Sequence, residues 1–562
     1  MNWIIEKNKN QKKVKQLAKE LNIDLVISRM LVNRGIETFE QAKLFFRPQI
    51  AHLHDPFLMK DMNIAVDRIL QSIENNESIM VYGDYDVDGI CSVALLSSYL
   101  EEIGANITTY IPDRNNEGYG ISIKGINKAN EDKQSLIIAL DCGIKANSQI
   151  EYAKSKKIDF IVCDHHFPGK NMPDAFAILN PKRNDCSYPF KDLCGCGVGF
   201  KLVQALNKKQ NKPIDKIIHF MDLVCLAVAA DVVPVIGENR VFSYLGLQLI
   251  NSNPRKALNL MLKNKIKKEY DFNDLMFFVS PRINAAGRMA HAEIALKFLK
   301  EQNENILNKL LEKIENLNHY RKETEKSTVN DSVEMIGSDY LTTTNSIILY
   351  KENWNKGVIG IVASRLVDKY YRPAIVLCKS LNGNLTGSAR SIKGIDLTQI
   401  LIKCEKYLLN YGGHKYAAGI TIKKENLSMF RKKFDLEITN ILKNKLPEKE
   451  IQIESFLNLD SITPKFIRIL KQFEPFGPGN LAPIFFSKEL NVKGEIKKLG
   501  KNKEHLRINV SQNSNQTYPA IGFWKSEKAD IISNELFEMA FTIEENDWNG
   551  KTSTQLHIKD LK

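Results

Sequence analysis

Between residues 78 and 232 the sequence repeats one unit, a short apolar run that is followed by a polar turn and then by a stretch with helical spacing. The runs are SIMVYG (78–83), NITTYI (106–111), SLIIAL (135–140) and DFIVC (159–163). Short runs that are rich in β-branched residues are typical of strands, and their alternation with helices is typical of a parallel sheet. The sequence therefore predicts an α/β fold for this part of the chain.

Acidic residues and histidines follow these runs at the points where the runs end. The first run leads into DYDVDG, the third ends on Asp, the fourth ends on Asp-His-His, and the apolar stretch 221–235 carries an Asp just before a proline. In an open parallel sheet the carboxyl ends of the strands form the edge at which ligands bind, so we expect these side chains to converge. The set is Asp84, Asp86, Asp88, Asp141, Asp164, His165, His166 and Asp231.

Carboxylates at alternate positions repel one another unless a cation joins them. Residues i and i+2 of an extended segment lie roughly 6.5 to 7 Å apart, so two of these carboxylates can hold different ions of a pair about 3.5 to 4 Å apart, with Asp141 as a bridge. Mixed carboxylate and imidazole ligands suit manganese better than magnesium. We therefore predict a site for two divalent ions, Mn²⁺ or Mg²⁺, of the kind that hydrolyses phosphorus esters.

Each motif has a simpler interpretation when it is taken alone. A calcium loop that starts at Asp84 would need Glu at its twelfth position, which here is Leu95. A lone Asp is typical of a turn, and isolated histidines are typical of the surface. Their coincidence at several run ends favours the metal site. The glycines of CGCGVGF (194–200) indicate close packing at the start of a helix, because no acidic residue follows at the spacing of a dinucleotide-binding fold.

This combination of motifs resembles the DHH phosphoesterase superfamily, and within it the RecJ exonucleases. The motifs are DxDxDG, a lone Asp at a run end, Asp-His-His and Asp-Val-Val-Pro. The resemblance extends over most of the chain, through IPDRNNEGYG (111–120), VSPRINAAGRM (279–289), GSARS (387–391), GGHKYAAG (412–419) and FEPFGPGN (473–480). It implies two α/β lobes, a parallel-sheet DHH phosphoesterase domain and a DHH-associated domain. A long helix would join the lobes, and a C-terminal β-barrel of the OB-fold type would follow.

The residue pattern agrees with this division. Residues 293–336 contain no Gly or Pro and have helically spaced apolar residues, and the chain beyond residue 480 turns to short alternating runs that are typical of a small barrel. We expect a catalytic domain with an N-terminal extension (1–298), a connecting helix (299–336), a DHH-associated domain (337–446) and an OB-fold domain that binds nucleic acid (447–562).

The resemblance also implies metal-site roles for individual residues. One ion would be held by Asp86 and Asp141. The other ion would be held by four residues, Asp88, Asp141, His165 and Asp231. Asp84 would support the loop and belong to the metal site, and His166 would act in catalysis by facing the scissile phosphate.

On the substrate side, the resemblance places Arg282 at a phosphate next to the ions, where it would neutralise charge. The 5′-terminal phosphate would be bound by Arg114, Ser388 and Arg390. A hydroxyl and a planar guanidinium in a Gly-flanked turn suit a phosphate on chemical grounds as well. His414 would lie along the cleft between the lobes.

Tyr82 departs from the family pattern, since some members carry a histidine at this position. A neutral phenol is a poor metal ligand, so the first ion would have fewer protein ligands. In the predicted barrel, basic residues near Phe523 and Trp524 could contact a single strand, with the aromatic rings available for stacking. We interpret Phe523 and Trp524 as core aromatics and assign no base-stacking residue.

The implied activity is that of a metal-dependent 5′-to-3′ exonuclease that is specific for single-stranded DNA, releases 5′-mononucleotides and serves DNA recombination and repair. Two alternatives stay open: a DHH phosphodiesterase for very short oligonucleotides, and a non-catalytic DNA-binding scaffold. The implied partners are single-stranded DNA, single-strand binding protein, and recombination or mismatch-repair proteins, with the chain acting as a monomer.

Composition is compatible with these expectations. A net charge of +13 fits a polyanionic partner, and it fits equally well a genome that favours lysine and asparagine codons. No stretch approaches the roughly 20 apolar residues of a membrane span, and the 9 cysteines contain no CxxC pair. We expect a cytoplasmic protein with reduced thiols and no membrane contact.

Overall fold

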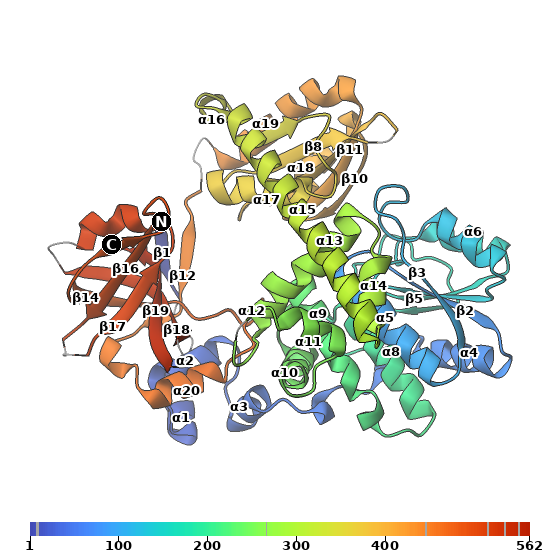
Figure 1. Cartoon of the computed structure of the whole chain (residues 1–562), viewed down its shortest axis with the longest axis horizontal. Coiled ribbons are helices and arrows are strands. Elements are labelled where there is room, and N and C mark those ends of the chain that lie inside the picture. The colour runs from blue at the N-terminus through green and yellow to red at the C-terminus, as the bar shows by residue number, and fades with distance from the viewer. Residues whose placement is uncertain are drawn as a thin grey trace.

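The structure is a computed structural model that describes the chain except for residues 7–9, 266, 381, 444–446, 514–515, 533–535 and 549–550. Figure 1 shows a first lobe at the lower right, a second lobe at the top and a barrel at the left. Helix α15 (Glu304–Ile336) runs from the first lobe to the second. The predicted fold class, two α/β lobes joined by a long helix and followed by a β-barrel, is confirmed.

The first lobe is built on a five-stranded parallel sheet with the order β3-β2-β4-β5-β6. The strands are β2 (Ser78–Gly83), β3 (Asn106–Tyr110), β4 (Leu136–Leu140), β5 (Asp159–Cys163) and β6 (Ala177–Leu179). Gly83 is paired with Leu140, and Leu140 is paired with Cys163. Because these residues end their strands in register, the segments that follow them start side by side at one edge.

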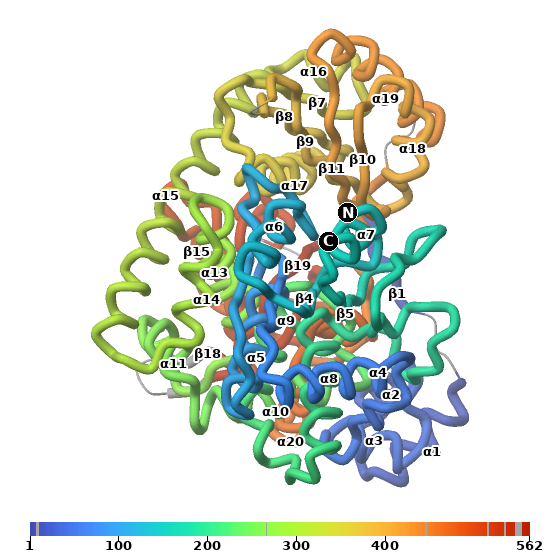
Figure 2. Tube along the Cα trace, turned by 90° about the vertical axis from the view of Figure 1, so that its right-hand side faces the viewer, coloured from blue at the N-terminus to red at the C-terminus, as the bar shows by residue number. Residues whose placement is uncertain are grey.

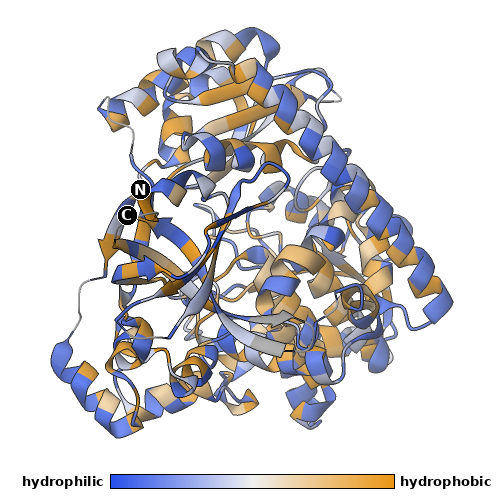
Figure 3. Cartoon of the chain, turned by 60° about the vertical axis from the view of Figure 1, so that its left-hand side comes forward, coloured by the Kyte–Doolittle hydropathy of each residue, from blue (hydrophilic) through white to orange (hydrophobic). Residues whose placement is uncertain are grey.

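Helices cover both faces of this sheet. The helices of this lobe are α4 (Met62–Glu74), α5 (Val87–Glu102), α6 (Ile123–Glu131), α7 (Asn147–Ser155), α8 (Gly195–Lys209), α9 (Met221–Asp231), α10 (Gly237–Ser252) and α11 (Lys256–Leu262). Of these, α10 packs on α9, and α11 packs on α15. Side chains alternate along β2, so Val81 packs in the large core with α5, whereas Tyr82 packs in a second core with α6 and α7. Figure 3 shows the apolar residues gathered in the sheets and on the inward sides of the helices.

The apolar stretch 221–235 differs from the other runs, because it forms helix α9 rather than a strand. Residues 221 to 229 of this helix are all buried. A helix that is buried on all sides is apolar all round and has no visible helical period. Asp231 therefore reaches the sheet edge from the C-terminal end of a helix, and the expectation that every metal-site residue follows a strand is wrong at this position.

Helices α12 (Phe272–Asp274), α13 (Ser280–Met289) and α14 (Glu293–Lys300) lead to α15. The second lobe has the strand order β10-β11-β9-β8-β7. Its elements are β7 (Ile347–Tyr350), α17 (Ile359–Tyr370), β8 (Ala374–Lys379), β9 (Leu385–Arg390), α18 (Leu397–Lys403), β10 (Leu408–His414), β11 (Ala417–Ile422) and α19 (Leu427–Leu442), after the short α16 (Tyr340–Thr343). Figure 2 shows this lobe above the first one, with α17 between them.

The barrel has seven strands in the order β13-β14-β18-β19-β17-β16-β15, and an additional β14–β16 pairing closes the ring. The strands are β13 (Ser455–Phe456), β14 (Phe485–Val492), β15 (Lys497–Leu499), β16 (His505–Ser511), β17 (Tyr518–Gly522), β18 (Phe537–Trp548) and β19 (Lys551–Leu561).

The N-terminal extension packs with the barrel rather than with the first lobe's sheet. Strand β1 (Asn2–Ile5) pairs with β12 (Glu450–Ile453). Helices α1 (Gln11–Leu21), α2 (Leu25–Asn33) and α3 (Phe39–Phe46) share a hydrophobic core with the barrel and with α20 (Pro464–Lys471). Among the described helices, none combines the length and the apolar character needed to cross a membrane.

Candidate active site

The carboxyl edge of the first lobe's sheet brings the predicted acidic and histidine side chains together. Three groups of potential metal ligands have donor atoms within 4.8 Å of one another. These groups are Asp84, Asp86 and Asp141; Asp88, His165 and Asp231; and Asp141, His165 and His166. Because Asp141 and His165 each belong to two groups, the clusters form one continuous centre.

Helix α8 fixes one side of this centre. The peptide N–H groups of Gly195 and Cys196 donate to the two carboxylate oxygens of Asp88, each at 2.7 Å. A helix N-terminus stabilises a carboxylate through its free N–H groups and its dipole. A Cβ atom at Gly195 would lie 2.6 Å from Asp141, so only glycine fits here. The predicted close packing at this helix start is confirmed.

The carboxylates of the centre lie close together, and several of their buried oxygens lack a hydrogen-bond donor among the described residues. Asp84 is 1% exposed, and the peptide groups of Tyr85 and Gly120 face it without reaching full hydrogen-bond geometry. Oδ1 of Asp141 is buried and has no hydrogen-bond partner within the described part of the chain. Burial raises the pKa of Asp141, and the neighbouring Asp88 and Asp86 raise it further.

Two further carboxyl groups show the same effect. Burial, followed by the charge of Asp86, raises the pKa of Asp88 to about 7. Burial and the charges of Asp88 and Asp86 raise the pKa of Asp231. Unpartnered carboxylate oxygens next to imidazole nitrogen are what divalent transition ions bind, so these residues fit the predicted pair of ions.

The two histidines have different environments. His165 is buried, and its Nε2 lies 3.1 Å from Oδ1 of Asp141 and 3.6 Å from Oδ2 of Asp231. Burial and the neighbouring His166 lower the pKa of His165 to about 3, so this ring is neutral, as a metal ligand must be. Burial disfavours the protonated ring of His166 and so lowers its pKa, but the hydrogen bond to Asp164 outweighs this and raises the pKa above its ordinary value.

Asp164 stands behind the histidines and orients them. Its Oδ1 accepts the peptide N–H groups of His165 and His166 and lies 2.7 Å from Nδ1 of His166, while its Oδ2 accepts the N–H of Ile144. Burial raises the pKa of Asp164, but the hydrogen bond between Asp164 and His166 outweighs this and keeps the pKa below the usual range. Asp164 is therefore a partner of the histidines rather than a direct ligand.

A basic pocket lies beside the acidic centre. Nη1 of Arg390 donates to Oγ of Ser388 at 2.9 Å, and the guanidinium of Arg114 lies 5.0 Å from the centre of the Tyr85 ring. Burial lowers the pKa of Arg390, and the charge of Arg114 lowers it further. The structure thus brings together three predicted phosphate-binding residues, and neither arginine forms an ion pair with an acidic residue in the part of the chain that the structure describes.

Arg288 in helix α13 belongs to this pocket, although the sequence did not single it out. Burial lowers its pKa to about 10, and Arg114 is the next largest cause. Asp86 acts in the opposite direction, so Arg288 lies near both the acidic centre and the basic pocket. Nη1 of Arg288 donates to the carbonyl of Gly357, which joins the two lobes.

Arg282, at the other end of α13, is not brought to the acidic centre in this structure. Its Nε contacts Oε1 of Glu315 in α15 at 2.7 Å, and its guanidinium lies 3.5 Å from the centre of the Phe278 ring. Both arginines occur in VSPRINAAGRM. Their helical phase was the signal that could have separated them, since residues six apart project from different sides of a helix.

His414 lies at the end of β10 in the second lobe and faces the first lobe. Burial lowers its pKa, and the next causes are the charges of His166, Lys145 and Lys182. All three of these neighbours belong to the first lobe, so His414 lies on the side of the second lobe that faces the first lobe.

An exposed aromatic group marks the barrel. Phe523 is 47% exposed and Trp524 is 70% exposed, so the interpretation of these residues as core aromatics is wrong. The ring of His505 contacts the rings of Phe523 and Trp524 edge-on. Trp524 has a φ of +58°, a conformation that costs free energy in a non-glycine residue.

Comparisons with known proteins agree with this architecture. The chain matches the family described as "DHH family, N-terminal domain" over residues 78–228, the "DHHA1 domain" over 343–440 and the "RecJ OB domain" over 453–560. It is 36% identical to the single-stranded-DNA-specific exonuclease RecJ of Bacillus subtilis, over 100% of this chain and 70% of the relative. It is 29% identical to the Escherichia coli exonuclease of the same name, over 82% of each chain.

Solved structures show the same likeness. The crystal structure of RecJ from Thermus thermophilus in complex with Mn²⁺ superposes with a TM-score of 0.85 at 25% identity, and the match covers 100% of this chain and 79% of that one. A second crystal structure of the Thermus protein contains Mg²⁺. The ions in both structures are of the kind that the donor set of this chain fits.

Proposed function

We propose, from the premise that this chain belongs to the RecJ family of single-stranded-DNA-specific exonucleases, that it digests single-stranded DNA from the 5′ end and releases 5′-mononucleotides. The observation that carries the proposal is the placement of the basic pocket beside the acidic centre. A terminal phosphate in the pocket would place the next phosphodiester at the centre. Cleavage there would yield one nucleotide at a time, which explains both the polarity and the product.

Asp86 and Asp141 would hold one divalent ion, and Asp88, Asp141, His165 and Asp231 would hold the other. Asp84, which lies in the same cluster, would support this arrangement. When bound, the two ions would activate a water molecule and neutralise charge on the scissile phosphate. The neutral state of His165 and the two N–H bonds to Asp88 prepare these side chains for binding.

His166 would face the scissile phosphate. Asp164 holds its Nδ1 and favours the protonated ring, so His166 would present a positive charge to an oxygen of the phosphate. Arg288 would stabilise negative charge between the two sites, and the predicted contact of Arg282 with a phosphate stays a prediction. In the pocket, Arg114, Ser388 and Arg390 would bind the terminal phosphate, with His414 along the strand's path.

The barrel would hold the strand before it enters the cleft. Phe523 and Trp524 offer exposed rings for base stacking, and Lys498 and Arg507 are exposed basic residues on the neighbouring strands β15 and β16. We propose that residues 1–46 form a unit with the barrel, on the basis of their shared core. The connecting helix begins at Glu304 rather than at residue 299, and we propose that the other predicted domain boundaries stand. We also propose that the protein is a cytoplasmic monomer that works with single-strand binding protein and with recombination or mismatch-repair proteins.

A time course on a single-stranded oligonucleotide that is labelled at either end tests this function. We expect immediate release of a labelled mononucleotide from the 5′ end with Mn²⁺ or Mg²⁺, and no release with chelator or with the Asp141→Ala protein. Cleavage of short oligonucleotides alone would favour the short-substrate phosphodiesterase. Binding without any cleavage would favour the scaffold.

A further inference from the structure

Tyr82, near the end of β2, makes contacts that indicate a role in holding a loop rather than a metal ion. Its side chain is 1% exposed and packs against Tyr110, with ring centroids 5.3 Å apart. Its hydroxyl donates to the carbonyl of Gly120 at 2.9 Å and accepts the N–H of Ser122 at 3.1 Å. The phenol is therefore used by the backbone of the loop that follows β3.

The helix beneath this loop leaves room for the Tyr82 ring. A Cβ atom at Gly125, in the first turn of α6, would lie 2.7 Å from Cε2 of Tyr82 and 3.0 Å from Cε1 of Tyr110. Any larger residue would displace the two stacked rings. Gly125 therefore completes a pocket whose shape fits tyrosine at this position.

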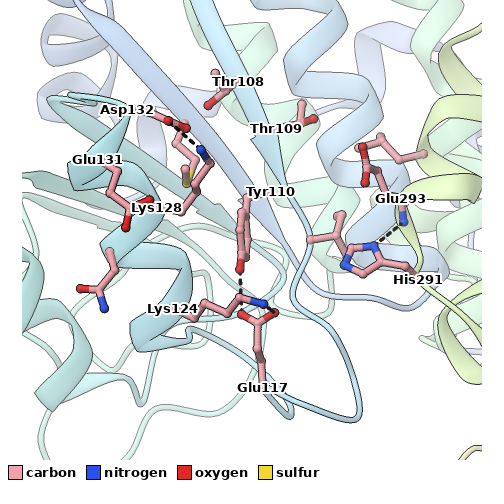
Figure 4. Close-up of a pocket in the computed structure, with 14 residues that line it drawn as sticks. Thr108, Thr109, Tyr110, Glu117, Lys124, Lys128, Glu131, Asp132, His291 and Glu293 are labelled. Carbon is pink, nitrogen blue, oxygen red and sulfur yellow. Dashed lines mark hydrogen bonds and ion pairs between the residues drawn. The ribbon is translucent and has the colours of Figure 1, made fainter.

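Glu117 ties the loop together from the other side. Its Oε1 accepts the N–H of Asp113 at 2.9 Å, and its Oε2 accepts the hydroxyls of Tyr110 at 2.8 Å and of Ser122 at 2.6 Å. Figure 4 shows Glu117 and Tyr110 in contact at the edge of a cavity of about 480 Å³. Ser122 is thus held by Tyr82 through its backbone and by Glu117 through its side chain.

The anchored loop carries two side chains into the cleft. One is Arg114, whose backbone carbonyl also accepts a hydrogen bond from Lys356 of the second lobe at 3.0 Å. The other is Tyr119, whose hydroxyl lies 3.1 Å from Nε2 of His166. Because Asp164 holds Nδ1 of the same ring, His166 is fixed at both nitrogens. Tyr119 directly precedes Gly120, the residue whose carbonyl Tyr82 holds.

We propose that the Tyr82 hydroxyl is the positioning group that fixes the loop 111–122 and thereby holds Tyr119 against His166. The inference rests on the proposed function, in which His166 faces the scissile phosphate. Without this hydroxyl, the backbone at residues 120 and 122 loses two hydrogen bonds, and the contact between Tyr119 and His166 loosens. A displacement of about 1 Å at a reacting group can lower a rate roughly a hundredfold.

The variant Tyr82→Phe tests this role, because it keeps the stacked ring and removes only the hydroxyl. On 5′-phosphorylated single-stranded DNA we expect kcat to fall at least about tenfold. The Mn²⁺ concentration that gives half-maximal rate should stay unchanged. Tyr119→Phe should lower kcat similarly, and the double variant should fall no further than the lower single variant, since both changes act through one contact.

Tyr99→Phe is the matched control. Tyr99 is another buried phenol of the first lobe, 2% exposed, and its hydroxyl has no hydrogen-bond partner among the residues that the structure describes. Its kcat should stay within about twofold of the unchanged protein, because no contact to the cleft is lost. Equal losses in Tyr99→Phe and Tyr82→Phe would overturn the proposal in favour of a general effect on the lobe.

Hydrogen exchange of backbone amides measures how firmly the loop 111–122 is held, and it does not depend on nuclease activity. Amides in the peptide 111–122 should exchange faster in Tyr82→Phe than in Tyr99→Phe. Unchanged exchange would overturn the anchoring role, and so would a raised Mn²⁺ requirement with unchanged kcat at saturation, which would assign Tyr82 to the metal site. Absence of DNA cleavage by the unchanged protein would contradict the proposed function. The exchange result would still show whether the Tyr82 hydroxyl holds the loop.

Discussion

The acidic centre and the basic pocket lie next to each other, but the chain builds them in different ways. The acidic centre collects residues that follow adjacent strands of one sheet in register, together with Asp231 from the end of α9. The basic pocket collects Arg114 from a loop, Arg288 from a helix and Arg390 from a strand of the other lobe. The first site depends on one sheet, whereas the second depends on how two lobes meet.

In both sites, burial and neighbouring like charges shift the pKa values toward the uncharged form, upward for the carboxyl groups and downward for the arginines. Burial and like charges raise the pKa of Asp88 and Asp141 in the centre, and burial and like charges lower the pKa of Arg288 and Arg390 in the pocket. Each site is therefore destabilised by its own charge and stabilised by a ligand of the other sign. Divalent ions and a phosphate are ligands of these two kinds.

The largest effect should come from Asp141→Asn, which removes one charge from the acidic centre without changing the shape of the side chain. We expect DNA cleavage to fall roughly a thousandfold or more, because Asp141 belongs to both proposed ion sites. In chelator the variant should melt at a higher temperature than the unchanged protein, since repulsion is relieved. Mn²⁺ should raise the melting temperature of the unchanged protein more than that of the variant.

These two readouts separate function from stability. A variant that still cleaves DNA at a comparable rate would show that Asp141 does not bridge the ions. A lower melting temperature of the variant in chelator would show that the charge of Asp141 is stabilised by other groups of the protein. The acidic centre would then not be destabilised by its own charge, as the comparison of the two sites requires.

A smaller loss should distinguish the two arginines of α13. Arg288→Ala should lower kcat/KM on 5′-phosphorylated DNA about a hundredfold, because a charge next to the reacting phosphate is lost. Arg282→Ala should lower it less, since Arg282 is paired with Glu315. Arg288→Ala should also reduce the slope of log binding constant against log salt by about 0.7, the value for one phosphate contact on a single strand. The opposite ranking would return the phosphate contact to Arg282.

This contrast explains how far the sequence alone could lead. Strand ends have a visible signal, since β-branched runs stop at polar clusters, and a parallel sheet must bring those ends to one edge. Seven of the residues that we predict for the metal site and for catalysis therefore lie together at this edge. The fold class followed from the same alternation and from the resemblance to a known family.

The errors arose where the signal depends on tertiary packing. Helix α9 is apolar on every side because it is buried, so its sequence does not show a helical period. The contact of Arg288 with the second lobe was missed for the same reason, because it depends on which face of α13 meets that lobe. Phe523 and Trp524 are exposed aromatics, which single-sequence reasoning assigns to a core because most aromatic residues are buried.

Trp524→Ala should have a moderate effect of another kind, because the aromatic group on the barrel acts without charge. We expect single-stranded DNA to bind more weakly by about 1 to 3 kcal/mol, the usual loss for one stacked base. The slope of log binding constant against log salt should stay unchanged, in contrast with Arg288→Ala. Phe277→Ala is a matched control, since Phe277 in the first lobe is equally exposed at 70%. Equal weakening by both variants would argue against a specific stacking role for the barrel.

The smallest effect concerns the stability of the metal-free protein at different pH values. Asp88 has a pKa of about 7 in the folded protein, against about 4 for a carboxyl group in an unfolded chain. Between these values the folded state binds a proton that the unfolded state does not, so the free energy of unfolding should fall as the pH rises from about 4 to 7.

The basic pocket contributes nothing to this slope, because the pKa of Arg288, about 10, lies above the window. Urea unfolding at pH 5, 6 and 7 should therefore show decreasing stability in chelator, and saturating Mn²⁺ should remove or reverse the decrease, since bound ions favour the charged carboxylates. Asp88→Asn should make the chelator profile less steep, because one titrating group is gone while the raised pKa values of Asp141 and Asp231 still contribute. A profile in chelator that is already flat in the unchanged protein would mean that the acidic centre carries no uncompensated charge, and the opposite signs of the two sites would then have no consequence for stability.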